Sequence, residues 1–314
     1  MAPGNISDSF FLEFLVTNQN ADGGWGFHPA SPSAVESTAW ALMAVLSSCA
    51  DSASYEDVCT RASAWLATAQ LADGSWPAFP GHPRGCWVTS VASMALHLSG
   101  EKQSAVDRGR DWVLNAWPAE GTLWWRLKQT IFPNRETRQN SALRGWSWTP
   151  GTASWVEPTA HALIFLRALP PDRVPQSASK RLQLAESMLF DRMCPGGGWN
   201  SGNPLIYGVG GVPRIGPTAW ALMALRDHAD RPEVQMSLDV LERSFADIKS
   251  AASLALAHRC LVVHKRRSAP FPSWALDLYA QNHFFENILT MAWVVLAINE
   301  KGRAENGRNA TATV

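Results

Sequence analysis

The residues with the clearest potential for chemistry are a carboxyl and an imidazole in the segment WVEPTAHAL, where Glu157 is followed four positions later by His161. Residues four apart on an α-helix lie on the same face. A histidine hydrogen-bonded to a carboxyl group tunes its proton affinity, which is the basis of general acid–base catalysis. A similar segment, AVESTAWAL, places Glu36 at the equivalent position. The pattern predicts a proton-transferring site around these three residues.

The same residues also suit a purely structural role. An acidic side chain in the first turn of a helix interacts favourably with the helix dipole, and a proline such as Pro158 fits that turn without losing a hydrogen bond. His161 departs from this simple explanation, because the equivalent position in the similar segments is tryptophan or valine. Both roles therefore stay open for Glu36 and for Glu157 with His161.

Tryptophan is the second chemical signal, with 16 tryptophans against 3 tyrosines. One group lies in glycine-containing turns and is predicted to be structural: Trp25, Trp76, Trp146 and Trp199. A second group lies at or near the starts of apolar helices: Trp40, Trp87, Trp155, Trp220 and Trp293. Aromatic faces at such positions either fill the core or line a site, where they shape an apolar ligand and stabilise cations. The second group therefore supplies candidate substrate-binding residues.

Basic residues gather in a long irregular segment, 123–148. Arg126, Lys128 and Arg144 lie in it together with two further arginines, against a single glutamate. Guanidinium and ammonium groups in this arrangement bind phosphate, although a solvated loop has the same composition. A second basic run, HKRRSAP at 264–270, is either a surface loop or a contact with an acidic membrane surface.

Other residue types that bear chemistry form no pattern. The eight histidines lack zinc-ligand spacing, and the single H-x-x-E pair of His283 and Glu286 is common by chance, so neither a metal nor a cofactor is predicted. Five cysteines without C-x-x-C spacing favour a reducing, cytoplasmic location. The formal net charge of zero gives no indication of a nucleic-acid partner. The first residues do not resemble a signal peptide, and no apolar run is long enough to span a membrane.

These residues lie on a repeated framework. The heptapeptide TAWALMA occurs at 38–44 and again 180 positions later, at 218–224. Weaker copies give six apolar segments, at 36–46, 87–98, 156–169, 216–225, 249–263 and 287–298. Each follows an amphipathic segment: 8–19, 56–70, 105–117, 178–190, 236–245 and 271–281. Helices that are apolar nearly all round are buried on most sides, so a closed double ring of inner and outer helices explains both classes.

The turns between outer and inner segments carry a second repeat, Q-x-x-D-G-[GS]-W, at 19–25 and 70–76. Glycine supplies the positive φ needed where a helix ends. The aspartate is expected to hydrogen-bond its own turn, the glutamine to bind the next repeat, and the tryptophan to stack across the junction. The Gly-Trp core returns in RGWSW at 144–148 and in PGGGWN at 195–200.

The Q-x-x-D-G-G-W turns and small-residue inner helices together resemble the QW repeat of squalene–hopene cyclases, oxidosqualene cyclases and plant-type diterpene cyclases, and also the β subunits of protein prenyltransferases. The resemblance covers about residues 8–300 and implies an all-α fold, one (α/α)6 toroid forming a single domain over 1–300. The polar tail, 301–314, is predicted to be disordered. In the family, the site lies at one mouth of the toroid, near the starts of the inner helices.

The resemblance also implies candidate acids. Class II terpene cyclases carry D-x-D-D-T-A at one inner-helix start, and its middle aspartate protonates an alkene or an epoxide. Aligning the T-A pairs places Glu36 (AVESTA) or Glu157 (WVEPTA) at that position, and neither copy has the flanking aspartates. The start that corresponds to the zinc-binding helix of the prenyltransferases reads GPTA, without a metal ligand.

The sequence thus predicts an isoprenoid-handling enzyme similar to a single-domain class II terpene cyclase, with Glu157, tuned by His161, or Glu36 as the proton donor. The alternative is a toroid without catalysis that binds a lipid or a partner protein, which the missing D-x-D-D and zinc ligands favour. Because the family generally pairs two helical domains, a homodimer or a second toroid chain is one way to complete the site. Peripheral contact with a membrane is a further expectation.

Overall fold

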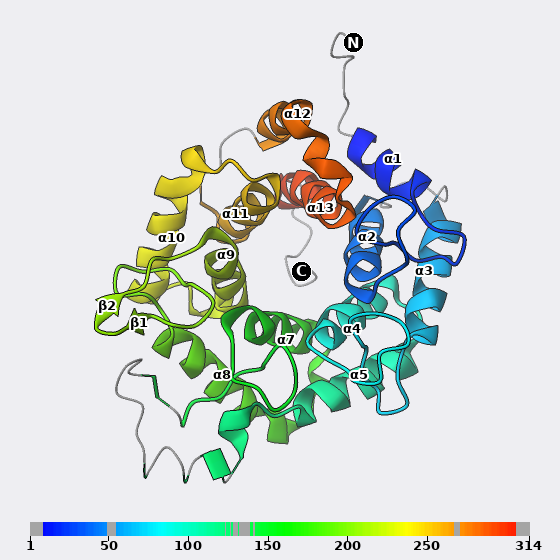
Figure 1. Cartoon of the computed structure of the whole chain (residues 1–314). Helices are drawn as coiled ribbons and strands as arrows, with labels where there is room; N and C mark the ends of the chain where they lie inside the picture. Colours follow the sequence, from blue (N-terminus) through cyan, green and yellow to red (C-terminus); the bar gives the residue numbers. More distant parts are fainter. Residues whose placement is uncertain are drawn as a thin grey trace.

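The computed structural model describes residues 9–48, 55–122, 124, 125, 127, 131, 139, 140, 142–266 and 271–305. Within them, inner and outer helices alternate along the chain and form two concentric rings, which confirms the predicted all-α toroid (Figure 1). The inner helices are α2 (Val35–Ser48), α4 (Val88–Ser99), α7 (Val156–Ala168), α9 (Ile215–Ala224), α11 (Ala251–Val263) and α13 (Ile288–Glu305). The outer helices are α1 (Ser9–Thr17), α3 (Glu56–Thr68), α5 (Gln103–Asn115), α8 (Ser179–Asp191), α10 (Pro232–Ser244) and α12 (Phe271–Asn282). The connections hold short 3-10 turns and a small antiparallel hairpin of β1 (Leu205–Ile206) and β2 (Val209–Gly210).

The inner ring is closed, because every inner helix packs against two others. The order around the ring is α2, α4, α7, α9, α11 and α13, and α13 packs against α2 again. Each outer helix packs on one or both of the inner helices beside it, and α1 lies in the seam between α13 and α2. The first helix of the chain therefore covers the joint between its first and last inner helices.

The two classes of helix differ in how much of their surface is buried. In α2 every residue from Ser37 to Val45 is buried, because this run is small or apolar on all sides. In α11 the buried run extends from Leu254 to Leu261. The outer helices bury one stripe only, which in α5 consists of Ala105, Val106, Gly109 and Val113.

A clasp that occurs four times joins each glycine turn to the inner helix after it. The backbone N–H of the turn tryptophan donates to a threonine hydroxyl in the first turns of that helix, as from Trp25 to Thr38 at 2.9 Å. The same bond joins three further pairs: Trp76 with Thr89, Trp146 with Thr159, and Trp199 with Thr218. Each indole N–H donates to a carbonyl of the preceding outer helix. These four tryptophans are buried, so their predicted structural role is confirmed.

The glutamine of each complete turn motif ties one repeat to the next. Gln19 Nε2 donates to the carbonyl of Val58 in α3, and Gln70 Nε2 donates to the carbonyl of Ala105 in α5, both at 2.9 Å. The aspartate of each motif accepts a backbone N–H of its own turn. The expected roles of the glutamine and the aspartate within the motif are therefore confirmed.

An arginine takes the glutamine's place at the third junction, where the sequence lacks the complete motif. Arg181 of α8 is buried between Trp117 and Trp146, with its guanidinium carbon 4.4 and 3.8 Å from the two ring centres. Its guanidinium donates to the carbonyl oxygens of Arg144 and Gly145 in the turn. Burial lowers the pKa of Arg181 to about 9, so the group stays charged at neutral pH.

The C-terminal end of the ring extends slightly beyond the predicted domain. Helix α13 ends at Glu305, and the rest of the predicted disordered tail, 306–314, lies outside the described residues. Among the helices that the structure describes, none is both long and apolar enough to cross a membrane.

Candidate functional site

A cavity of about 440 Å³ lies at the mouth of the toroid where the inner helices begin. All six inner helices contribute to it, either from their first turns or from the residue just before them. Its walls consist of Glu36, Trp87, Trp148, Glu157, His161, Gly216, Pro217, Trp220, Ala252, Ser253, Leu256 and Trp293. Two carboxyl groups thus face a chamber whose other walls are mainly aromatic and apolar.

The repeat explains why these particular positions line the cavity. Thr38, Thr159 and Thr218 each donate a backbone hydrogen bond to the carbonyl four residues earlier, so they lie at the same level of the ring. The two glutamates lie two residues before this level. Four residues that line the cavity lie on an inner ring two residues after it: His161, Trp220, Leu256 and Trp293. Equivalent positions in the repeats therefore occupy equivalent places in the lining of the cavity.

An aromatic cluster forms the floor of the cavity. The centres of the His161 and Trp220 rings are 4.3 Å apart, and the Trp40 ring lies 5.4 Å from Trp220. Trp293 completes the cluster at 5.9 Å from Trp40. Trp40 is almost fully buried and supports the floor from behind rather than lining the cavity.

Trp87 and Trp148 form one wall, with ring centres 4.9 Å apart in an edge-to-face arrangement. The N–H of Trp87 donates to the carbonyl of Trp148 at 3.1 Å, which fixes the two residues together. The sequence reasoning missed Trp148. Its signal was the doubled tryptophan of RGWSW, whose first member fills the structural position and leaves the second free for the mouth.

Glu36 is the more strongly perturbed of the two carboxyl groups. Burial raises its pKa to about 7, so a substantial fraction is protonated at neutral pH. The thiol of Cys86 lies close enough for the two groups to interact: burial is the main reason that the pKa of Cys86 is raised, and the charge of Glu36 raises it further. The neutral form of Glu36 therefore holds a proton at the edge of an apolar chamber.

Glu157 lies in a more polar setting. Burial raises its pKa, whereas a hydrogen bond from the Ser201 hydroxyl and the charge of Arg214 act in the opposite direction. The Ser201 Oγ donates to Glu157 Oε1 over 3.4 Å, and the buried Oε2 has no hydrogen-bond partner. Glu157 is thus better able than Glu36 to carry a negative charge.

The predicted hydrogen bond between Glu157 and His161 is not among the interactions of the described residues. Glu157 instead reaches Ser201, in the connection that leads to α9. Burial among tryptophans lowers the pKa of His161 to about 3, which keeps the imidazole neutral. His161 is therefore an aromatic residue of the cavity lining, and the geometry does not provide the predicted tuning of Glu157 through a hydrogen bond with His161.

The other predicted site residues lie away from the cavity or outside the described residues. Trp155 precedes α7 and pairs with Trp146 across a short bridge. Arg144 lies over the Trp117 ring, 5.2 Å from its centre, at the third junction. Arg126 and Lys128 lie outside the described residues, as does most of the basic segment around them.

In the described part of the second basic run, 264–266, Arg266 is already paired within the fold. Arg266 forms ion pairs with Asp239 and Glu242 at 2.9 and 3.1 Å, so its charge is neutralised within the fold. Within the part of the chain that the structure describes, no group of three or more histidine, cysteine, aspartate or glutamate side chains is arranged to hold a metal ion.

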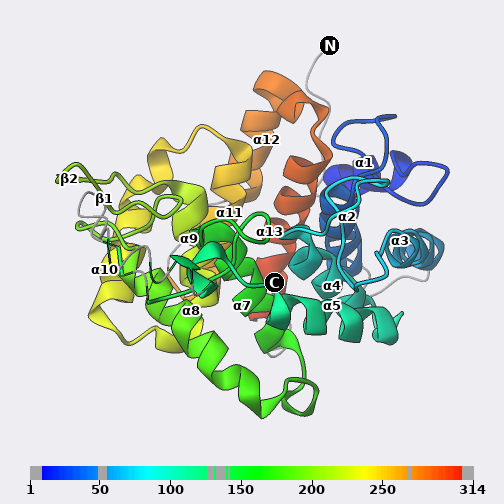
Figure 2. The same cartoon turned by 60° about the horizontal axis from the view of Figure 1, so that its bottom comes forward.

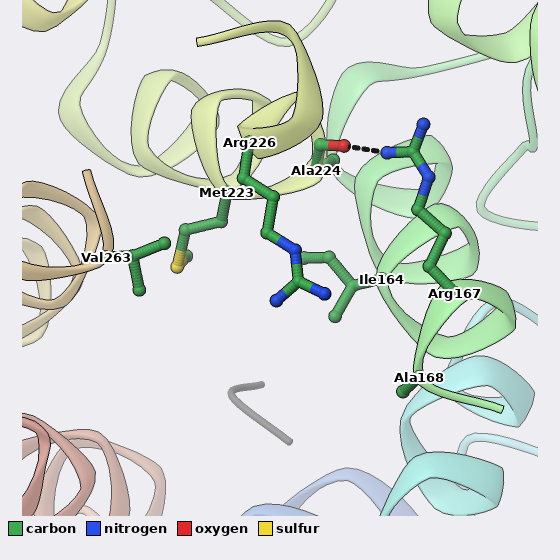
Figure 3. A pocket seen from close by; sticks show the side chains of 7 residues that line it. All are labelled: Ile164, Arg167, Ala168, Met223, Ala224, Arg226 and Val263. Carbon is green, nitrogen blue, oxygen red and sulfur yellow. Dashed lines mark hydrogen bonds between the residues drawn. The ribbon is translucent and has the colours of Figure 1, made fainter. Parts of the chain in front are cut away.

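A much smaller cavity lies at the opposite end of the toroid, between the final turns of α7, α9 and α11 (Figure 3). Its volume of about 10 Å³ leaves room for about one water molecule. Arg167 donates to the carbonyl of Ala224 and pairs with Glu186, while Arg226 points into the space. Cations at the carboxyl ends of helices interact favourably with the helix dipoles, so Arg167 and Arg226 have a structural role at this end of the ring.

The fold and the mouth site together define a helical toroid with an aromatic, carboxyl-bearing chamber. The family model described as the squalene–hopene cyclase N-terminal domain matches residues 12–122. No curated protein sequence matches the chain. The resemblance to the terpene cyclase superfamily that the repeats predicted is therefore confirmed over this segment. Solved structures share the fold over most of the chain.

Three solved structures illustrate that likeness. The apo type II terpene cyclase MstE from Scytonema has a TM-score of 0.61 at 14% identity, over 95% of this chain and 98% of that chain. A protein from Actinoplanes has a TM-score of 0.55 at 15% identity, over 88% and 79%. Rex8A from Paenibacillus barcinonensis, solved in complex with xylose, has a TM-score of 0.53 at 9% identity, over 94% of each chain. At these identities the likeness is one of fold, so function has to be argued from the site.

Proposed function

We propose that the protein is an acid catalyst for an isoprenoid, which lies in the mouth cavity and cyclises after protonation. The observation that carries this proposal is the pairing of a buried carboxyl group, Glu36, whose pKa burial raises to about 7, with a chamber walled mainly by aromatic and apolar side chains. A proton donor starts such a reaction, and the electron-rich faces of indole rings stabilise the cation that results.

The two carboxyl groups suit different steps of the reaction. Glu36 holds a proton near neutral pH because burial disfavours its charged form, which makes it the donor. Glu157 retains a negative charge more readily, because Ser201 and Arg214 stabilise its carboxylate. A carboxylate in this position attracts the cation and takes up the final proton. Two carboxyl groups whose surroundings push their pKa values apart are a recurrent basis for assigning acid and base.

The raised pKa of Glu36 also bears on the kind of isoprenoid. A carboxyl group with a pKa of about 7 is a weak acid, and neither glutamate has the flanking aspartates of the D-x-D-D motif. Such a group transfers its proton more readily to an oxygen than to an isolated alkene carbon. An isoprenoid epoxide therefore suits this site better than an unfunctionalised polyene.

A single toroid is sufficient for this proposal. The solved type II terpene cyclase MstE is covered over 98% of its chain by 95% of this chain, so the two chains have nearly the same extent. The mouth cavity draws on all six inner helices of one chain, and its walls need no residue from a partner. This favours a site completed within one chain over one shared with a second toroid.

The test is conversion of a panel of prenyl diphosphates, squalene and terminal isoprenoid epoxides, analysed by mass spectrometry for bound and converted species. We expect a cyclised product from the wild type, and a loss of at least about a hundredfold in Glu36→Gln with ligand binding retained. Glu157→Gln should change the products, because the final proton acceptor is lost. Glu13→Gln, on the outer face of α1, is the matched control and should behave as the wild type.

Other outcomes separate the alternatives. An isoprenoid that is bound by every variant and converted by none would establish the non-catalytic lipid-binding toroid instead. Conversion that is unchanged in Glu36→Gln and abolished in Glu157→Gln would reverse the assignment of donor and acceptor. The absence of both binding and conversion would overturn the proposal and favour a protein partner.

A further inference from the structure

His161 stands in a layer of the inner ring that is otherwise built from tryptophan and aliphatic side chains. Each inner helix contributes the residue two positions after its level threonine or the equivalent of that threonine. In ring order these residues are Trp40, Val91, His161, Trp220, Leu256 and Trp293. Five of the six repeats therefore fill this position with an indole or an aliphatic chain. Packing of the layer alone does not account for an imidazole in the sixth.

The imidazole of His161 makes ring contacts only. It lies against the rings of Trp40, Trp87 and Trp220, and no hydrogen bond of either ring nitrogen is found among the described residues. The indole nitrogens of Trp40 and Trp293 are enclosed by surrounding atoms, whereas neither nitrogen of His161 is. Only 8% of the His161 surface is exposed, and this residue lines the mouth cavity. The accessible part of the imidazole therefore faces the cavity.

A buried polar group without a hydrogen-bond partner is unfavourable, because it has lost its water and gained nothing in return. Other polar side chains of the inner helices do have partners in the fold. The hydroxyl of Thr159, two residues before His161, accepts the N–H of Trp146 and donates to the carbonyl of Trp155. His97 of α4 bonds the carbonyl of Ala168 through Nε2. The partner of His161 is therefore expected to come from a molecule in the cavity.

We propose that His161 binds a hydroxyl group of the ligand at the floor of the mouth cavity, so that the isoprenoid is an alcohol held with its oxygen inward. A neutral imidazole has one N–H donor and one acceptor nitrogen, and a hydroxyl group can bind either, whichever nitrogen carries the proton. A ketone or ether oxygen matches the N–H alone. This assignment rests on the proposed function for the isoprenoid chain, but it does not depend on catalysis.

The charges around the cavity favour a neutral group at this point. The described lining contains the carboxyl groups of Glu36 and Glu157 and neither lysine nor arginine. Arg214, whose charge acts on Glu157, is exposed just before α9. Burial lowers the pKa of His161 to about 3, so the imidazole supplies no positive charge at neutral pH. An anionic group at the floor would therefore lack a counter-ion among the described residues.

His161 lies deeper in the ring than the carboxyl groups, which fixes the direction of the ligand. The connections that lead into α2 and α9 project from the same side of the ring, where the inner helices begin (Figure 2). Glu157 lies in the first turn of α7, and His161 follows four residues later, about 6 Å further along the helix axis. A hydroxyl group bound at His161 leaves the rest of the chain toward the mouth. The end of the isoprenoid that reacts is then the end remote from the hydroxyl group.

The test compares the binding of farnesol with that of the hydrocarbon of the same chain, in which hydrogen replaces the hydroxyl group, by quenching of tryptophan fluorescence. We expect His161→Phe, which keeps an aromatic ring, to bind farnesol about tenfold more weakly than the wild type and the hydrocarbon equally well. His161→Gln retains a donor and an acceptor and should recover part of the affinity for farnesol. Leu256→Met changes an apolar residue of the same layer and should bind both ligands as the wild type does.

Farnesyl diphosphate tests whether the bound group is neutral. Its affinity should be the same in the wild type and in His161→Phe, because a charged group does not reach the floor. A loss of affinity for the diphosphate as large as that for farnesol would overturn the assignment of a neutral group. Thermal melting monitored by circular dichroism shows whether His161→Phe folds, and His161→Leu, which repeats the aliphatic choice of Leu256, replaces it if it does not.

The remaining outcomes separate this proposal from the proposed catalysis. Equal affinity for farnesol in the wild type and in His161→Phe would overturn the proposal and indicate that water occupies the imidazole. Wild-type protein that binds no farnesol would overturn it as well. Farnesol bound through His161 in a protein that converts no isoprenoid would support this proposal and contradict the proposed catalysis alone.

Discussion

At the scale of single residues, the site rests on what burial does to three titratable side chains. Burial raises the pKa of Glu36 to about 7 and lowers that of His161 to about 3. Burial also raises the pKa of Glu157, but Ser201 and Arg214 oppose this shift. The result is a neutral acid, a carboxyl group that can carry charge, and a neutral imidazole around one cavity. These three states lead to separate predictions about pH.

Activity is expected to fall with rising pH, because the donor Glu36 must be protonated. With a pKa of about 7, the rate should fall about tenfold per unit well above pH 7. Glu36→Gln should abolish activity at every pH, rather than move the pH at which the rate begins to fall. A rate profile that shows no limb between pH 6 and 8 would exclude Glu36 as the essential acid.

Stability is expected to depend on pH through His161. Its pKa is lowered in the folded protein, so the unfolded chain binds a proton first as the pH falls below about 6.5. The stabilisation present above that pH is then lost, by roughly 3 kcal/mol between pH 6.5 and pH 4. Urea unfolding should show that His161→Phe, which keeps an aromatic wall, loses less stability than the wild type over this interval. Equal losses in both proteins would contradict the placement of a neutral, buried imidazole.

At the scale of elements, the clasp between a turn tryptophan and an inner-helix threonine holds each repeat together. Thr38→Val keeps the shape of the side chain and leaves the N–H of Trp25 buried without an acceptor. We expect a cost of about 1–3 kcal/mol in the free energy of unfolding, measured in urea. Thr68→Val is the control, because its exposed hydroxyl bonds only a carbonyl of its own helix. A clasp without energetic importance would give the two variants the same small effect.

The sequence predicts most of the helices and turns, because the signals for them are local. The heptapeptide copies and the glycine turns identify inner helices, outer helices and four structural tryptophans. Glu36 and Glu157 are placed at the mouth by the same register. The sequence fails where a partner comes from another repeat: nothing local indicates that Ser201 rather than His161 is the partner of Glu157, or that Trp148 joins the wall. The third junction is missed for the same reason. The side chain that takes the place of the glutamine there, Arg181, belongs to a different helix.

At the scale of the whole molecule, ring closure packs every inner helix against two others, so we expect the six repeats to unfold as one cooperative unit. Helix α1 packs against both α13 and α2, so deletion of residues 1–17 opens the seam between the first and last inner helices. In an open repeat array the remaining repeats would keep their stability. Here we expect the deletion to lower the midpoint of urea unfolding and to broaden the single transition of the full chain. An unchanged midpoint would show that closure contributes little.

The face around the cavity mouth also depends on closure of the inner ring. The connections that lead into the inner helices belong to different repeats and surround the mouth only because the inner ring is complete. The chamber, its two carboxyl groups and its opening are therefore products of the whole ring. No single repeat contains a site.

The central claim, that this chamber protonates an isoprenoid, is tested most directly by running the conversion in D2O and analysing the product by mass spectrometry. From a polyene we predict one non-exchangeable deuterium per cyclised product, because cyclisation begins with a solvent-derived proton held by Glu36 and transferred to carbon. A product derived from an epoxide would carry that deuterium on oxygen, where it exchanges with solvent, so for this substrate the prediction is a solvent deuterium isotope effect on the wild-type rate and no conversion by Glu36→Gln. A product that forms without deuterium from a polyene, or at the same rate in Glu36→Gln, would contradict protonation by this carboxyl group.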